Sequence, residues 1–223
     1  MSVRGLSRAG ADAVRGDAFW PAQLAVLAAL ALNLALPEKL TLGPSWLVPS
    51  VEGLLLAALV LTTPRRTADE GPARRWAALG LIALVSIANT SSLVLLVHFL
   101  LQGGKANGHQ LILSSIVIWL TNVIIFGLWY WELDRGGPGE RAADHPRTPD
   151  FLFPQMVTPD VGPPAWRPNF VDYLYVSFTN ATAFSPTDTM PLTPWTKVLM
   201  LVQSLASLIT VALVAARAVN ILS

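Results

Sequence analysis

Residues 170–222 read FVDYLYVSFTNATAFSPTDTMPLTPWTKVLMLVQSLASLITVALVAARAVNIL. This stretch joins a short amphipathic segment, a turn rich in Ser, Pro, Thr and Asp, and a long apolar run. The run at 194–222 is long enough to cross a bilayer, which takes about 20 residues. The segment at 171–184 is too short to cross and too apolar for an ordinary loop. Because such a segment is tolerated at membrane depth only inside protein or beside a wet cavity, the stretch predicts a re-entrant helix before a last span.

The composition is that of a membrane protein. Of the 223 residues, 53% are hydrophobic and only 13% are charged, whereas soluble domains carry about 25% charged residues. The net charge of +1 gives no indication of a nucleic-acid partner. The chain has no cysteine, and its three histidines lack metal-ligand spacing, so we expect no metal and no cofactor. No serine-nucleophile motif or paired membrane aspartates occur either, and we therefore do not expect an enzyme.

Four more apolar runs precede the last one, at 18–36, 46–63, 76–101 and 111–131. The sequence thus predicts an all-α integral membrane protein with five transmembrane helices and one re-entrant, pore-loop-like helix. Residues 1–110 form an N-terminal three-helix region in this interpretation. Residues 111–223 form a second region, composed of an outer helix, a long loop at 135–169, the re-entrant helix at 171–184, a turn at 185–193 and the last helix at 194–222. The apolar segment 151–154 of the loop either lies on the membrane surface or covers another part of the protein.

The basic residues predict an orientation. With the N-terminus in the cytoplasm, 12 of the 15 Lys and Arg residues fall inside, and only Lys39, Lys105 and Arg217 fall outside. The positive-inside rule favours this arrangement, and the short loop with four arginines at 65–75 is its best support. The re-entrant segment then opens toward the cytoplasm.

Residues 177–197, SFTNATAFSPTDTMPLTPWTK, align without a gap to a known module. They resemble the pore helix, selectivity filter and inner-helix start of bacterial potassium channels. The matching positions are Ser177, Ala181, Thr182, Asp188, Pro191, Thr193 and Trp195, with Lys197 at a basic position. The resemblance implies that 111–131 is an outer helix and 194–222 an inner helix. It also implies a cytoplasmic C-terminus, opposite to the charge rule. The whole chain resembles a group of bacterial multi-pass membrane proteins with four helices, a dip and a last helix.

The filter departs from the potassium-channel pattern. Potassium filters use T-V-G-Y-G, whose backbone carbonyls replace the hydration shell of the ion and whose glycines permit the required dihedral angles. The equivalent turn here contains Thr182, Ala183, Phe184, Ser185, Pro186, Thr187 and Asp188. Both glycines are missing, and Pro186 has a fixed φ and no N–H. We therefore expect no potassium-type carbonyl ladder. Selectivity would come from the side chains of Ser185, Thr187 and Asp188, or from a cavity.

Asp188 and one face of the last run have two interpretations each. Asp188 forms a ring of carboxylates around a pore in an oligomer, or it bonds the backbone of its own turn. Gln203, Ser207 and Thr210 follow the spacing i, i+4, i+7 and so share a helix face. That face lines a water-filled pathway, or it packs against neighbouring helices through small and polar side chains.

Taken together, these patterns predict a multi-pass protein of the bacterial plasma membrane. Its predicted function is that of an ion channel or channel-like permeation protein with a degenerate selectivity filter. The expected partners are the lipid bilayer, further copies of the same chain and a monovalent cation, and no nucleic acid. The alternative is a non-conducting scaffold or accessory protein that keeps the pore-module fold.

Overall fold

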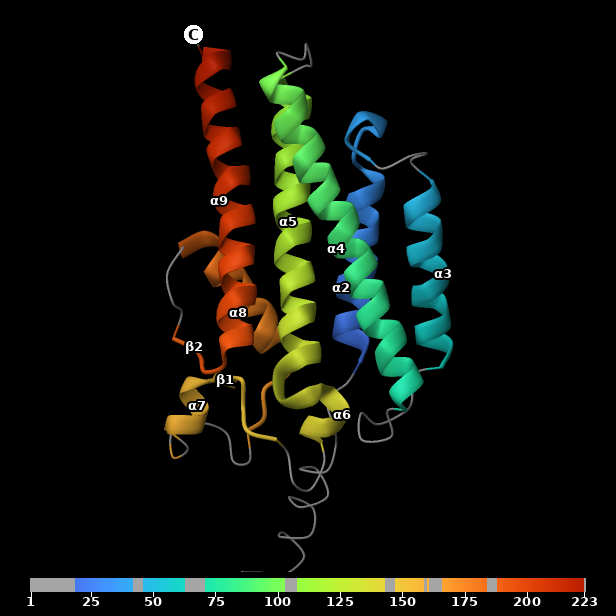
Figure 1. Ribbon diagram of the computed structural model, residues 1–223, viewed down its shortest axis with the longest axis vertical. Coiled ribbons are helices and arrows are strands. Elements are labelled where there is room, and N and C mark those ends of the chain that lie inside the picture. The colour runs from blue at the N-terminus through green and yellow to red at the C-terminus, as the bar shows by residue number, and fades with distance from the viewer. Residues whose placement is uncertain are drawn as a thin grey trace, which may run out of the picture.

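The computed structural model describes residues 19–41, 46–62, 71–102, 108–142, 147–158, 160, 166–183 and 188–222. Five helices run roughly along the longest axis of the molecule, and a shorter helix, α8 (Phe170–Ala183), lies beside α9 (Figure 1). The five are α2 (Trp20–Leu34), α3 (Leu47–Leu61), α4 (Pro72–Leu101), α5 (Gly108–Leu133) and α9 (Pro194–Leu222). A 3₁₀ turn, η1 (Glu38–Leu40), follows α2. The protein is therefore a mostly helical bundle, as predicted.

Three helices among the described residues, α4, α5 and α9, are long and apolar enough to cross a membrane. The two others, α2 and α3, have 15 residues each. At 1.5 Å per residue each is roughly 22 Å long, which is less than the hydrocarbon thickness of about 30 Å. Three of the five predicted runs thus form helices that could span a membrane.

The predicted helix boundaries are close to those observed in the C-terminal part. The last helix begins at Pro194 and ends at Leu222, as predicted, and α8 begins one residue before the predicted 171. In contrast, α4 begins four residues before the predicted 76, because Pro72 occupies its first turn. Proline fits there since it has no N–H to leave unpaired and its φ is already helical.

The larger of two apolar clusters connects the two predicted regions. It includes Leu81 of α4, Ile125 and Leu128 of α5, Val176 of α8 and Met200 of α9. The central helix is α5, which contacts α2, α4, α8 and α9. The boundary predicted between residues 110 and 111 falls inside α5, which begins at Gly108.

The long loop at 135–169 contains regular structure, which the sequence interpretation did not predict. Its described part holds η3 (Asp134–Gly136), α6 (Pro138–Arg141), β1 (Phe151–Leu152) and α7 (Pro154–Val157). The strand β1 pairs antiparallel with β2 (Met190–Pro191), which lies in the predicted turn at 185–193. Phe151 and Phe153 are buried in the core. Of the two interpretations of this apolar segment, covering another part of the protein is the one confirmed.

The helix α8 enters the bundle from the end that holds β1 and β2. Its first turn lies near the end of α5, where Tyr173 bonds Asp134. Its last turn lies about a quarter of the way along α9, where Asn180 Nδ2 donates to the backbone oxygen of Met200. The chain then returns to β2 at the end of the bundle from which α8 started (Figure 1).

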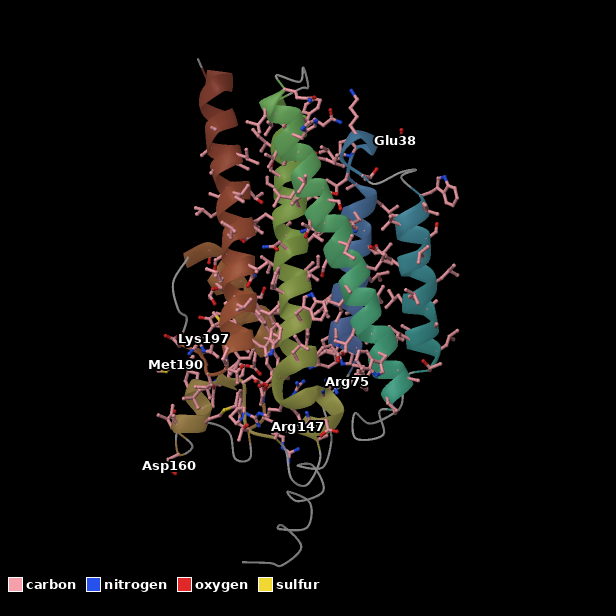
Figure 2. The ribbon with its side chains drawn as sticks, in the orientation of Figure 1. Glu38, Arg75, Arg147, Asp160, Met190 and Lys197 are labelled. Atoms are coloured by element: carbon pink, nitrogen blue, oxygen red, sulfur yellow. The ribbon has the colours of Figure 1, made fainter. Side chains whose placement is uncertain are left out.

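The described charges are unevenly distributed between the two ends of the bundle. Arg75, Arg147 and Lys197 lie toward one end, together with Asp160, and Glu38 lies at the other (Figure 2). The end rich in basic residues is also the end at which α8 enters.

The close approach of α5 and α8 depends on a glycine. A Cβ atom added to Gly127 would lie 3.2 Å from the backbone Cα of Leu174. The two backbones can lie this close only because Gly127 has no side chain, which is a common device where membrane helices meet.

We expect Gly127→Ala to lower the free energy of unfolding by about 1–2 kcal/mol, because the new methyl group forces α8 away from α5. The matched control is Gly80→Ala in α4, where nothing lies within 4 Å of the added Cβ. That control should be neutral or slightly stabilising, since alanine favours helices over glycine. Unfolding by dodecyl sulfate titration in mixed micelles measures both. Equal stabilities of the two variants would contradict this account of the α5–α8 contact.

Candidate functional site

The candidate site is a buried polar junction where α5, α8 and α9 meet. Membrane helices carry few polar side chains, and those that face inward need hydrogen-bond partners from the protein. The junction is organised around Gln203 of α9, which is fully buried. The other polar members are Asn122 and Tyr130 from α5, Ser177 and Asn180 from α8, and Ser204 and Ser207 from α9.

The side-chain amide of Gln203 makes four hydrogen bonds. Its Oε1 accepts from the hydroxyl of Tyr130 at 2.6 Å and from Nδ2 of Asn180 at 2.8 Å. Its Nε2 donates to the backbone oxygen of Ser177 at 2.9 Å and to Oγ of the same residue at 2.6 Å. A glutamine amide has two donors and two acceptor sites, so all are used. One side chain thus joins three helices.

Further bonds fix α8 on both sides. Toward α9, Asn180 Nδ2 donates to the backbone oxygen of Met200 at 3.0 Å, and Ser204 Oγ lies 3.2 Å from Asn180 Oδ1. Toward α5, Ser177 Oγ donates to the backbone oxygen of Val123 at 2.6 Å. The short helix is therefore held at its depth by polar contacts as well as by its apolar face.

The predicted helix face of α9 is buried inside the chain. Gln203 bonds α5 and α8, as described above, and Ser207 Oγ accepts from Asn122 Nδ2 of α5 at 3.0 Å. Thr210 Oγ1 donates to the backbone oxygen of Ala206 in its own helix at 2.8 Å. These contacts are those of helix packing, the second of the two interpretations. A pathway along this face stays a prediction.

The predicted turn is only partly described. Thr182 is exposed, and its hydroxyl donates to the backbone oxygen of Phe178, one helical turn earlier, at 3.0 Å. Ala183 is the last residue of α8. Phe184, Ser185, Pro186 and Thr187 lie outside the described residues. Asp188 is exposed. The structure therefore brings Gln203 and Ser207 into the junction, while Thr182 and Asp188 lie apart from it on the surface.

A second polar cluster, which the sequence interpretation missed, closes the end of the bundle at which α8 enters. The carboxylate of Asp134 is fully buried. Its Oδ1 accepts from the backbone N–H groups of Asp150 at 2.8 Å and Phe151 at 3.3 Å. Its Oδ2 accepts from the hydroxyl of Tyr173 at 2.5 Å and lies 3.6 Å from Nε of Arg135. One carboxylate thus connects the end of α5, the strand β1 and the first turn of α8.

Arg141 supports the same cluster from α6. Its Nη1 donates to the backbone oxygens of Trp131 at 2.5 Å and Asp134 at 3.0 Å. Its guanidinium lies over the ring of Tyr173, 5.1 Å from the centroid. The last carbonyls of a helix lack partners within it, so Arg141 caps the end of α5. The positive φ angles of Arg135, Gly136 and Gly137 turn the chain there.

The sequence carried a weak indication of this cluster. Ionisable residues that directly follow an apolar run, as Glu132 and Asp134 do after α5's aromatic residues, are read first as surface groups. Here both are buried. The adjacent Gly136-Gly137 pair, which permits a reversal of the chain, is the signal that could have placed Asp134 under the loop rather than in water.

Comparison with family models, curated proteins and solved structures finds no match. Within the part of the chain that the structure describes, no three His, Cys, Asp or Glu side chains are grouped to hold a metal ion. The two clusters consist of amides, hydroxyls and ion pairs that fix one short helix between two long ones.

Proposed function

We propose that the protein crosses the bacterial plasma membrane five times and that α8 is re-entrant. Support for α2 and α3 as crossings comes from their position in the bundle and their exposed apolar side chains, among them Leu24, Leu27 and Leu54. Trp20 and Trp46, at or next to the starts of these helices, are exposed and suit the membrane interface. Local thinning of the bilayer accommodates helices that are somewhat short. Support for a re-entrant α8 comes from its 14 residues and from the return of the chain to β2.

The orientation that we propose places the end rich in basic residues in the cytoplasm. Its support is the gathering of Arg75, Arg147 and Lys197 toward one end of the bundle (Figure 2), together with the positive-inside rule. A reporter enzyme fused after residue 223 should then report a C-terminus outside the cytoplasm. A cytoplasmic C-terminus would instead favour the orientation of potassium channels.

We infer that the protein is a channel-like permeation protein. The observation that carries this proposal is the junction at Gln203, which holds a helix too short to cross at partial depth between α5 and α9. A helix that lies at membrane depth without crossing the membrane is typical of selectivity elements and transport pathways. The helix leads directly into the turn that resembles a filter, so the junction fixes the depth of that turn.

The pathway in this proposal lies between copies of the chain. One module of outer, re-entrant and last helix does not enclose an axis, so several copies are needed. The exposed carboxylate of Asp188, which follows the turn, would then form a ring that attracts monovalent cations. Since the glycines of a carbonyl filter are missing, selectivity in this proposal rests on side chains of the turn.

Ion flux into liposomes containing purified full-length protein tests the proposal. We expect cation flux in the wild type and a decrease of about tenfold for Asp188→Asn, because a ring of charge concentrates cations at the entrance. Asp160→Asn removes another exposed carboxylate, in the loop after α7, and serves as the matched control with unchanged flux. Absence of flux for every cation, in folded and multimeric protein, would contradict permeation.

A non-conducting scaffold is the second candidate, and one observation favours it. Every donor and acceptor of the Gln203 amide is used inside the protomer, so this side chain offers nothing to a water-filled pathway. In that case the junction serves only to position α8 as a docking element. The flux experiment separates the two candidates, because a scaffold assembles without conducting.

A further inference from the structure

A groove of about 720 Å³ lies on the side of the bundle between α4 and α9. Residues of α5 form its floor, and its walls are mainly aliphatic. Val94 of α4 and Val202 and Leu205 of α9 line the groove and are themselves largely exposed, so it opens sideways, toward lipid in a membrane. The groove borders the junction at Gln203, because Asn122, one of the polar residues of the junction, also lines it.

One polar side chain in the groove lacks a partner. Asn89, which is residue 18 of the 30 in α4, is only 5% exposed and lines the groove. Its Oδ1 is buried without a hydrogen bond. Two other polar groups of the groove do have partners. Ser86 Oγ accepts from Trp129 Nε1 at 3.0 Å, and Asn122 Nδ2 donates to Ser207 Oγ. A buried amide oxygen without a hydrogen bond is unfavourable, so a ligand that donates to it gains affinity.

The volume of the groove suits a small ligand. The lining residues of α4 run from Ser86 to Leu101, which corresponds to roughly 22 Å along the helix. At about 720 Å³, the groove falls within the range of about 300–1,000 Å³ that is usual for sites of small ligands with apolar walls and few polar groups.

We propose that this groove binds a lipophilic alcohol, that is, a membrane-soluble molecule with an apolar body and one hydroxyl group that pairs with Asn89. The aliphatic walls contact the apolar body. A hydroxyl group both donates and accepts, so it satisfies the side-chain amide at a depth where water is absent. An ordinary acyl chain also contacts the aliphatic walls, but it leaves the side-chain amide of Asn89 without a hydrogen bond. The inference does not depend on conduction.

The test uses a photoreactive octanol that carries a diazirine, with purified full-length protein in detergent and in vesicles. Mass spectrometry locates the labelled peptides. We expect labels on the α4 and α9 residues that line the groove, and we expect excess octanol to suppress them at a concentration at least tenfold below that needed for octane. This tenfold difference between octane and octanol is the contribution expected from the hydrogen bond with Asn89.

Three variants sharpen the test. Asn89→Leu keeps the side-chain size and should raise the octanol concentration for half-maximal competition about tenfold, leaving octane unchanged. Val202→Phe narrows the groove and should reduce its labelling severalfold. The neighbouring Leu201→Phe is the matched control, because Leu201 is 69% exposed and does not line the groove. Monodisperse elution of each variant shows that it is folded.

Three results would overturn the proposal. Equal competition by octane and octanol would show that bilayer lipid fills an unselective groove. Labels spread evenly over the outward faces of α9 would show that no site exists. Cross-linking of α4 to a helix of a second chain in native membranes, with no label in the groove, would assign this surface to a protein partner.

Discussion

Replacing Asp134 by alanine is expected to lower the free energy of unfolding by about 3–5 kcal/mol. The buried carboxylate accepts from two backbone N–H groups and the hydroxyl of Tyr173, and it faces the guanidinium of Arg135. Removing it leaves these donors buried without an acceptor and a charge without its partner, which is the costly way to break an ion pair. Dodecyl sulfate titration in mixed micelles measures the loss. Amide hydrogen exchange at 150–157 should also accelerate, because β1 loses its anchor.

The control for this prediction is Glu140→Ala in the same end of the bundle. Glu140 lies 3.6 Å from Arg147, but the two side chains are 50% and 66% exposed, so the pair contributes at most about 1 kcal/mol. Asp134→Asn keeps one acceptor oxygen, so its loss of unfolding free energy should lie between those of Asp134→Ala and Glu140→Ala. If Asp134→Ala were no less stable than Glu140→Ala, the carboxylate would not be the anchor of this cluster.

Asp134 and Glu140 show which structural features can be predicted from the sequence and which cannot. The helices α8 and α9 were predictable, because the length and apolar content of a run reflect the thickness of a bilayer. The environment of Asp134 was not predictable. Its partner Tyr173 lies 39 residues away, across a loop whose composition gave no sign of α6 or β1.

Glu52 illustrates the same limit in the N-terminal half. Its place near the start of an apolar run suggests a side chain that reaches the membrane interface. In the structure Glu52 is fully buried, in the helix α3 that packs against α2 and α4. The neighbouring helices determine whether a polar residue on a membrane helix points inward or outward. The sequence of one apolar run does not indicate which helices will pack against it.

The candidate site follows this rule as well. The spacing of Gln203, Ser207 and Thr210 correctly predicted that they share a face, since helical geometry alone determines it. The partners on that face, Ser177 and Asn180, follow from packing. Both lie in the segment that resembles a pore helix, 26 and 23 residues before Gln203. The polar residues of α8 therefore bond it to α9. Mutation of these residues can test what holds α8 at its depth.

We expect Gln203→Leu to release α8 and to lower the free energy of unfolding by about 3 kcal/mol. The variant removes four hydrogen bonds and leaves the hydroxyl of Tyr130 and the groups of Ser177 without their α9 partner. Hydrogen bonds between membrane helices contribute about 0.6 kcal/mol each on average and up to about 1.7. Four of them therefore account for a loss of this size.

Two measurements distinguish release of α8 from a general loss of stability. Amide hydrogen exchange should accelerate in α8 by at least tenfold, while α4, which has no bond to Gln203, keeps its protection. The matched control is Gln102→Leu, the same substitution at an exposed position just after α4, and it should change neither quantity. Uniform acceleration in α4 and α8 would mean that Gln203 stabilises the bundle as a whole. Unchanged exchange in α8 would mean that its apolar face alone holds it, and the junction would then lose its role in setting the depth of the turn.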